Sequence, residues 1–114
     1  MKRGEIWLLS LDTAIGAEIQ KTRPCIIVSV DQLGKLPLKV IIPITDWKNH
    51  YEDVPWMVKL IPDNFNFLQK VSAADCFQVR SVSESRIIRK LGIINEDQLK
   101  EICIALALVF NIRY

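Results

Sequence analysis

The chain has 114 residues and half of them are hydrophobic, which suits one domain with a buried core and argues against disorder. Its net charge of +2 permits a polyanionic partner but does not require one. Three cysteines, Cys25, Cys76 and Cys103, lie in apolar runs without CxxC or CxxH spacing. The sequence therefore predicts neither a disulfide framework nor a zinc site, and no metal or cofactor is expected.

The N-terminal residues lead almost directly into a predicted strand and lack the apolar region and cleavage site of a signal peptide. The longest apolar run, from Ile102 to Phe110, is far shorter than the roughly 20 residues that span a bilayer. We therefore expect a soluble, cytoplasmic protein without a membrane partner.

Apolar runs rich in β-branched residues predict strands over 5–11, 25–30, 39–45, 56–61, 72–79 and, in short form, 87–91. Pro43 is expected at or near the end of the third strand. The loop before Arg23 is long for a hairpin, and such loops are often binding loops. Residues 81–86 offer a serine cap and one helical turn.

A C-terminal helix is the clearest element. Asn95 can cap it, and Glu96 and Asp97 place negative charge in its first turn. Apolar residues then recur at helical spacing: Leu99, Ile102, Cys103, Leu106, Val109 and Phe110. This wide stripe can pack on a sheet or against a second subunit. The pattern predicts a single domain over 1–114, mainly β with α: a small SH3-like curved antiparallel sheet or barrel with a C-terminal helix.

Pro24 holds Arg23 in an extended conformation at the start of the second predicted strand. A guanidinium there can bind a phosphate in bidentate fashion, or it can cap carbonyls or pair with a carboxylate. His50 is the only histidine, which excludes a two-histidine ribonuclease mechanism within one chain, and we expect it at the surface. Trp47 lies in a polar loop, where its ring could stack on a base.

Four short segments follow one another along the chain: Arg3-Gly4-Glu5-Ile6-Trp7, Lys21-Thr22-Arg23-Pro24, Pro43-Ile44-Thr45 and Gln78-Val79-Arg80. In this order and spacing they resemble the MazF/PemK toxin endoribonucleases. The chain differs from the usual family pattern at Thr13-Ala14, at Ala17 and at Phe77, which affects the expected contacts of the loop with RNA.

The resemblance implies an SH3-like barrel that forms a homodimer, cuts single-stranded RNA at short sequences without a metal, and is neutralised by an antitoxin. By position, Arg23 and Thr45 are implied to be the catalytic pair. Seven further residues are candidates for RNA binding: Glu18, Gln20, Lys21, Asp46, Trp47, Gln78 and Arg80.

Metal-free RNA cleavage uses the ribose 2′-OH as nucleophile and gives a 2′,3′-cyclic phosphate and a 5′-OH. In that reaction Arg23 would stabilise the charge on the phosphorane. The alternative is a toxin of the same fold that binds a protein target such as DNA gyrase without cutting anything. An inactive RNA binder is a third possibility, recognisable by salt-dependent affinity without products.

Overall fold

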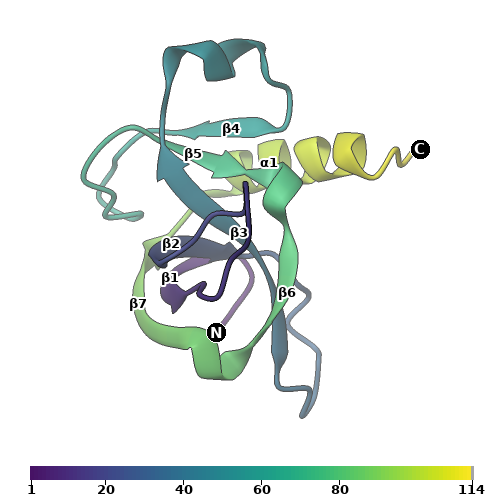
Figure 1. The fold of residues 1–114 in the computed structure, drawn as a ribbon. Helices are drawn as coiled ribbons and strands as arrows, with labels where there is room; N and C mark the ends of the chain where they lie inside the picture. Colours follow the sequence, from purple (N-terminus) through teal and green to yellow (C-terminus); the bar gives the residue numbers. More distant parts are fainter. Residues whose placement is uncertain (114) are drawn as a thin grey trace.

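The computed structural model describes residues 1–113, which form seven strands, three short 3₁₀ turns and one α-helix (Figure 1). The strands and the helix are β1 (Glu5–Ser10), β2 (Thr22–Ile27), β3 (Leu38–Asp46), β4 (Met57–Leu60), β5 (Ser72–Asp75), β6 (Arg80–Ser83), β7 (Ile87–Ile93) and α1 (Glu96–Val109). No helix among the described residues is both long enough and apolar enough to cross a bilayer.

The long strand β3 joins two parts of the sheet. One of its edges pairs with β2, while the other pairs with β6 along residues 38–41 and with β5 along residues 44–46. Strands β1, β2, β3, β6 and β7 curl into a barrel, and β4 and β5 extend the sheet beyond it (Figure 1). All strand pairs are antiparallel, so the predicted curved sheet with a C-terminal helix is confirmed.

Alternate residues of the strands build two cores. One apolar cluster fills the barrel: Leu9, Leu11, Cys25, Ile27, Ile41 and Val82. The opposite face of the sheet packs against α1 through a second cluster that includes Ile26, Ile42, Ile44, Leu60 and Ile102. Because adjacent strand residues point to opposite faces, β2 and β3 contribute to both cores.

Helix α1 begins with the expected cap. The side chain of Asn95 accepts a hydrogen bond from the backbone of Gln98 at 2.8 Å, and the Gln98 side chain accepts one from the backbone of Asn95 at 3.2 Å. This reciprocal capping box satisfies two N–H groups that a helix leaves unpaired. Part of the apolar stripe stays open, since Ile104 is 72% exposed and Phe110 58%.

The expectation of one strand over 72–79 was wrong. Strand β5 ends at Asp75, residues 76–78 form a 3₁₀ turn, and β6 starts at Arg80. The side chain of Asp75 caps this turn by accepting a hydrogen bond from the backbone of Phe77 at 3.2 Å. Because of this interruption, β5 pairs with residues 44–46 of β3 while β6 pairs with residues 38–41.

Two proline expectations also change. Pro43 lies inside β3, between the stretches that pair with β5 and β6, where a residue without an N–H can be accommodated. Strand β2 starts at Thr22 and ends at Ile27, so the predicted bounds of 25–30 were wrong and Arg23 lies inside the strand. The extended conformation that Pro24 favours at Arg23 is already that of a strand.

Candidate active site

Strands β2 and β3 bring Arg23 and Thr45 together. The β2–β3 ladder ends at the pair Cys25 and Pro43, and Arg23 and Thr45 each lie two residues beyond that end. Both residues line one cavity of about 400 Å³, and both side chains are half-buried. Because both residues line the same cavity, their side chains can act on one bound group.

The guanidinium of Arg23 is only partly engaged. Its Nε donates a hydrogen bond of 3.3 Å to the carbonyl oxygen of Gln20, which is the carbonyl-capping arrangement considered from the sequence. Among residues 1–113 no carboxylate pairs with Arg23, and its two Nη groups have no hydrogen-bond partner. The fork of donors therefore remains available to a phosphate.

The wall of this cavity is rich in positive charge. Lys70 and Arg89 line it together with Arg23, against the single carboxylate of Asp46. Lys70 and Asp46 form an exposed ion pair at 3.1 Å. An exposed pair of this kind contributes little to stability, so Lys70 can exchange its partner for a phosphate at small cost. The excess of cations suits a polyanion.

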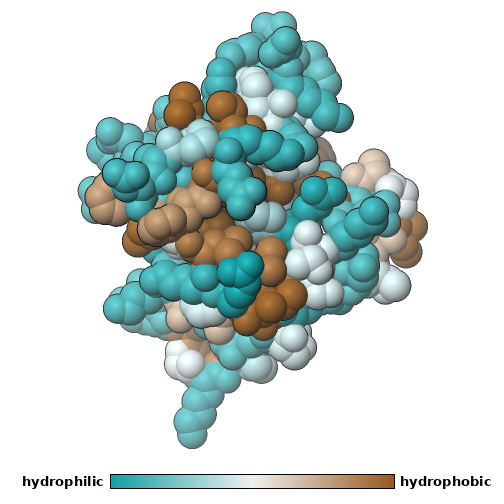
Figure 2. All heavy atoms as spheres, turned by 90° about the vertical axis from the view of Figure 1, so that its left-hand side faces the viewer, coloured by the Kyte–Doolittle hydropathy of each residue, from teal (hydrophilic) through white to brown (hydrophobic). Residues whose placement is uncertain are grey.

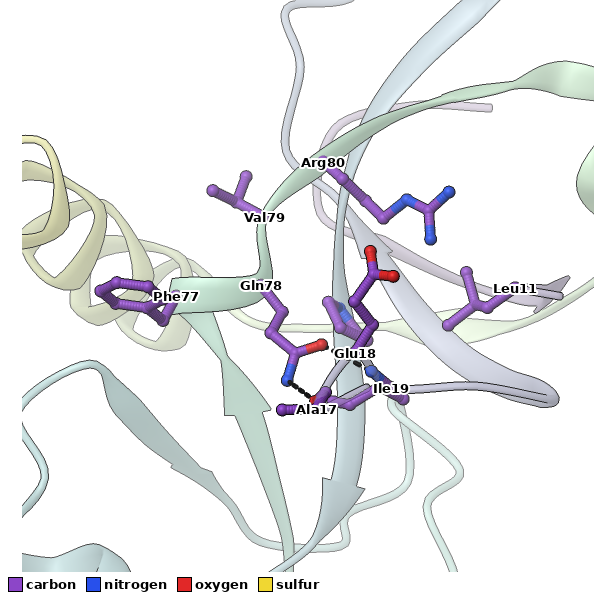
Figure 3. A pocket seen from close by; sticks show the side chains of 9 residues that line it. Leu11, Ala17, Glu18, Ile19, Phe77, Gln78, Val79 and Arg80 are labelled. Carbon is purple, nitrogen blue, oxygen red and sulfur yellow. Dashed lines mark hydrogen bonds between the residues drawn. The ribbon is translucent and has the colours of Figure 1, made fainter. Parts of the chain in front are cut away.

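A second cavity, of about 470 Å³, is lined by Pro43 of β3 together with residues of the β1–β2 loop and residues 77–80. Glu18 and Arg80 extend into the space between the β1–β2 loop and β6 (Figure 3). The charge of Arg80 also reaches Cys25, where burial nevertheless raises the pKa of the thiol to about 12. One carboxylate and one guanidinium thus face the same space.

Gln78 holds the β1–β2 loop against this second cavity. Its Oε1 accepts a hydrogen bond from the backbone of Ile19 at 2.6 Å, and its Nε2 donates one to the carbonyl of Ala17 at 3.2 Å (Figure 3). The carboxylate of Glu18 in the same loop accepts a hydrogen bond from the backbone of Ile15 at 2.7 Å. These contacts give the long loop a defined shape.

Comparison with known proteins decides the family. Residues 2–110 match the family described as PemK-like, MazF-like toxin of type II toxin–antitoxin system. The chain belongs to this family. The MazF/PemK resemblance predicted from the sequence is therefore confirmed, and it spans both strands that carry Arg23 and Thr45.

Individual relatives of this MazF-like chain agree with that assignment. Endoribonuclease MazF9 of Mycobacterium tuberculosis is 31% identical over 114 residues, which cover 95% of this chain and 94% of the relative. The crystal structure of MazF from Deinococcus radiodurans superposes with a TM-score of 0.81 at 23% identity and covers 98% of this chain and 97% of its own. An endoribonuclease in complex with its cognate antitoxin, from Mycobacterial species, superposes with a TM-score of 0.77 at 16% identity. The superposition covers 100% of this chain and 98% of the endoribonuclease chain.

The remaining candidates of this MazF-like chain lie apart from both cavities or at their edges. Gln20 and Lys21 are exposed at the end of the β1–β2 loop, and the backbone of Lys21 donates to the side chain of Asp12 at 2.9 Å. Trp47 is half-buried and lines neither cavity. Lys59 Nζ lies 5.0 Å from the centre of its ring, so that face is occupied. His50 is exposed, as expected.

Sequence reasoning missed three residues at the cavity of Arg23 and Thr45 in this MazF-like chain: Phe67, Lys70 and Arg89. Phe67 and Lys70 lie in the loop before β5, and Arg89 lies in β7. No motif marks them. Only the pairing of β7 with β1, which sets Arg89 opposite Leu8, brings this arginine to the cavity.

Proposed function

We propose that this chain is a metal-independent endoribonuclease that cuts single-stranded RNA and is the toxin of a toxin–antitoxin pair. The observation that carries the proposal is the convergence of Arg23 and Thr45 on one cavity whose wall holds two further cations. The endoribonuclease name of the relative that is 31% identical supports the same activity. A binder of a folded protein would not need a guanidinium and a hydroxyl at one cavity.

In this reaction the ribose 2′-OH loses its proton as it attacks the adjacent phosphorus. The bond to the 5′-oxygen of the next nucleotide breaks, and that oxygen takes up a proton. The products are a 2′,3′-cyclic phosphate and a 5′-OH. Arg23 donates to the oxygens of the phosphorane, where negative charge grows, and Thr45 donates one more hydrogen bond. A guanidinium stays protonated at neutral pH, so Arg23 stabilises charge and does not act as the general base.

Glu18 does not line the cavity of Arg23 and Thr45. It lines the second cavity with Gln78 and Arg80, and its carboxylate is engaged by the backbone of Ile15. We propose that Glu18 and Arg80 lie along the RNA path beyond the cut site and that Gln78 positions the loop that carries Glu18. The carboxylate and guanidinium of Glu18 and Arg80 can read the edges of a base there.

The test is incubation of purified protein with single-stranded RNA in EDTA, followed by mapping of the cut ends. We expect discrete cuts, 2′,3′-cyclic phosphate ends, and no cut where the nucleotide 5′ of the bond is a 2′-deoxyribonucleotide. Cleavage of that deoxy substrate would exclude internal attack. Absence of any cleavage, with or without EDTA, would contradict the nuclease function.

The variant Arg23→Ala separates catalysis from folding. We expect it to lose cleavage while its thermal unfolding and its oligomeric state match those of the wild type. If Arg23→Ala unfolds instead, the contact of Arg23 with the carbonyl of Gln20 is structural and the catalytic role is wrong.

Two protein partners belong to the proposal. The first is a cognate antitoxin, such as the one bound to the structurally similar mycobacterial endoribonuclease. The second is another copy of this chain. Support for a homodimer comes from the exposed apolar residues Ile104, Leu108 and Phe110 of the C-terminal segment. Light scattering of wild type and of Ile104→Glu measures the homodimer, which we expect the charged variant to weaken. The gyrase-binding alternative gains no support from the relatives, since the one that is 31% identical is named an endoribonuclease.

A further inference from the structure

The loop between β4 and β5, residues 61–71, is rigid because a buried asparagine organises it. The side chain of Asn66 is fully buried, and its Oδ1 accepts hydrogen bonds from the backbones of Asp63 at 3.1 Å and Leu68 at 3.0 Å. Its Nδ2 donates to the carbonyl of Ile61 at 2.9 Å. The Asp63 carboxylate accepts from the backbones of Phe65 and Asn66, both at 2.8 Å.

The same loop is fastened to β7. The backbone of Ile93 donates a hydrogen bond of 3.0 Å to the carbonyl of Phe65. At Gly92, a Cβ atom would lie 2.6 Å from the carbonyl oxygens of Phe65 and Asn66, so only glycine allows this approach. The loop therefore has one shape and one position, at the side of the barrel that lies on the left of Figure 1.

This rigid loop presents two aromatic rings to solvent. Phe65 and Phe67 are each 68% exposed. Phe67 also has a φ of +53°, a left-handed conformation that costs a residue with a bulky side chain about 1 kcal/mol. A single exposed ring is ordinary, but two on a loop held by buried hydrogen bonds, one with a strained backbone, indicate a functional surface.

The position of Phe67 suggests what that surface binds. Phe67 lines the cavity of Arg23 and Thr45, and it also lines the neighbouring cavity of about 430 Å³ beside β7. Phe67 thus borders both cavities. Figure 2 shows the side of the molecule on which this loop lies, with apolar atoms near the middle of the face and hydrophilic residues around them.

We propose that Phe67 is a stacking platform for a base of the RNA next to the cleaved phosphodiester, an inference that rests on the proposed nuclease function. With the phosphate on Arg23, the neighbouring nucleotide can turn its base onto the ring while Arg89 or Lys70 binds the next phosphate. Stacking on an aromatic ring is typical of single-strand recognition and contributes about 1–3 kcal/mol per base. The cations around the ring favour RNA over an apolar protein surface.

The test measures the affinity for a single-stranded RNA oligonucleotide that contains the mapped cut site, with a 2′-deoxyribonucleotide 5′ of the cut to prevent cleavage. We expect Phe67→Ala to raise the Kd about 5- to 150-fold, the range that this stacking energy predicts, and Phe67→Trp to retain the wild-type Kd. The slope of log Kd against log salt should not change, because no phosphate contact is removed.

Phe65→Ala is the matched control, since Phe65 has the same exposure but does not line the cavity of Arg23 and Thr45. It should change the Kd by less than about twofold. Wild-type affinity of Phe67→Ala would overturn the inference, and so would a loss of the dimer with unchanged RNA affinity, which would make Phe67 a protein contact. Failure of the wild type to cut RNA would instead overturn the proposed function, and the two failures are distinguishable.

Discussion

The side-chain oxygen of Gln78 lies 2.6 Å from the backbone nitrogen of Ile19, and this hydrogen bond joins the 3₁₀ turn after β5 to a loop 59 positions earlier in the chain. The amide nitrogen of Gln78 completes the connection at the carbonyl of Ala17. Both polar groups of this side chain are therefore used within the protein. Gln78 positions the β1–β2 loop, which carries Glu18 and ends at Lys21, two residues before Arg23.

We expect Gln78→Ala to lower the free energy of unfolding by about 1–2 kcal/mol, since each of the two hydrogen bonds contributes roughly 1 kcal/mol. The backbone amide of Ile19 should exchange with solvent faster, and kcat/KM for RNA should fall because the loop loses its shape. Gln78→Glu keeps an acceptor for Ile19 but loses the donor to Ala17, so its effect should be intermediate.

Hydrogen exchange followed by mass spectrometry or NMR measures the exchange rates of the backbone amides in the β1–β2 loop. Phe77→Ala serves as the control at the neighbouring exposed position. If Gln78→Ala weakens RNA binding while the exchange of Ile19 is unchanged, then Gln78 contacts RNA directly, as the sequence resemblance first suggested.

At Thr45, the hydroxyl and the shape of the side chain can be separated. Thr45→Val keeps the shape and removes the donor, so we expect kcat to fall about 100-fold, the usual effect of losing one donor to a developing oxyanion. Thr45→Ser keeps the donor and should retain most of the activity. Single-turnover cleavage rates measure both variants. Equal rates for Thr45→Val and wild type would exclude a role of this hydroxyl in the reaction.

Glu5 makes the stability depend on pH. Burial by itself raises the pKa of this carboxyl, but the ion pair with Lys90 at 2.8 Å and the N–H groups of Lys2 and Trp7 outweigh it and lower the pKa to about 2. In the unfolded chain the pKa is near 4.5. The unfolded state therefore binds more protons between these values, and the contribution of Glu5 is complete above about pH 4.5 and is lost as the pH falls toward 2.

Urea unfolding across pH 2 to 6 measures this dependence. Glu5→Gln should be less stable than wild type at pH 6 by about 1–2 kcal/mol, a modest value because the Lys90 side chain is half exposed and its charge is screened. The free energies of unfolding of the two proteins should converge near pH 2. A constant difference across the whole range would contradict the assignment of the low pKa to Glu5.

The three cysteines should differ in reactivity. Burial raises the pKa of the Cys25 and Cys76 thiols to about 12, so neither forms the reactive thiolate at pH 8. Cys103 is partly exposed on α1, and a guanidinium nitrogen of Arg3 donates to its sulfur at 3.0 Å. A thiol reagent should modify one cysteine per native chain and three in denaturant. Cys103→Ser should remove the native reaction, and rapid labelling that persists in this variant would contradict the buried positions.

The sequence alone determined the family, the α1 cap and most strands, because these follow from local signals. Asn95 precedes a run with helical periodicity, and the β-branched runs mark strands whatever their neighbours. The segments around Arg23 and Thr45 are short, specific motifs, so the resemblance identified this pair without any knowledge of strand pairing.

Only the tertiary structure decided how those segments meet and what surrounds them. The break between β5 and β6 depends on their pairing with different stretches of β3, and the true start of β2 depends on its pairing with β1. Arg89 and Phe67 reach the cavity from elements that carry no motif, one through the β7–β1 register and the other through a loop held by Asn66. Long-range pairing and buried side-chain hydrogen bonds depend on residues far apart in the chain, so no local pattern encodes them.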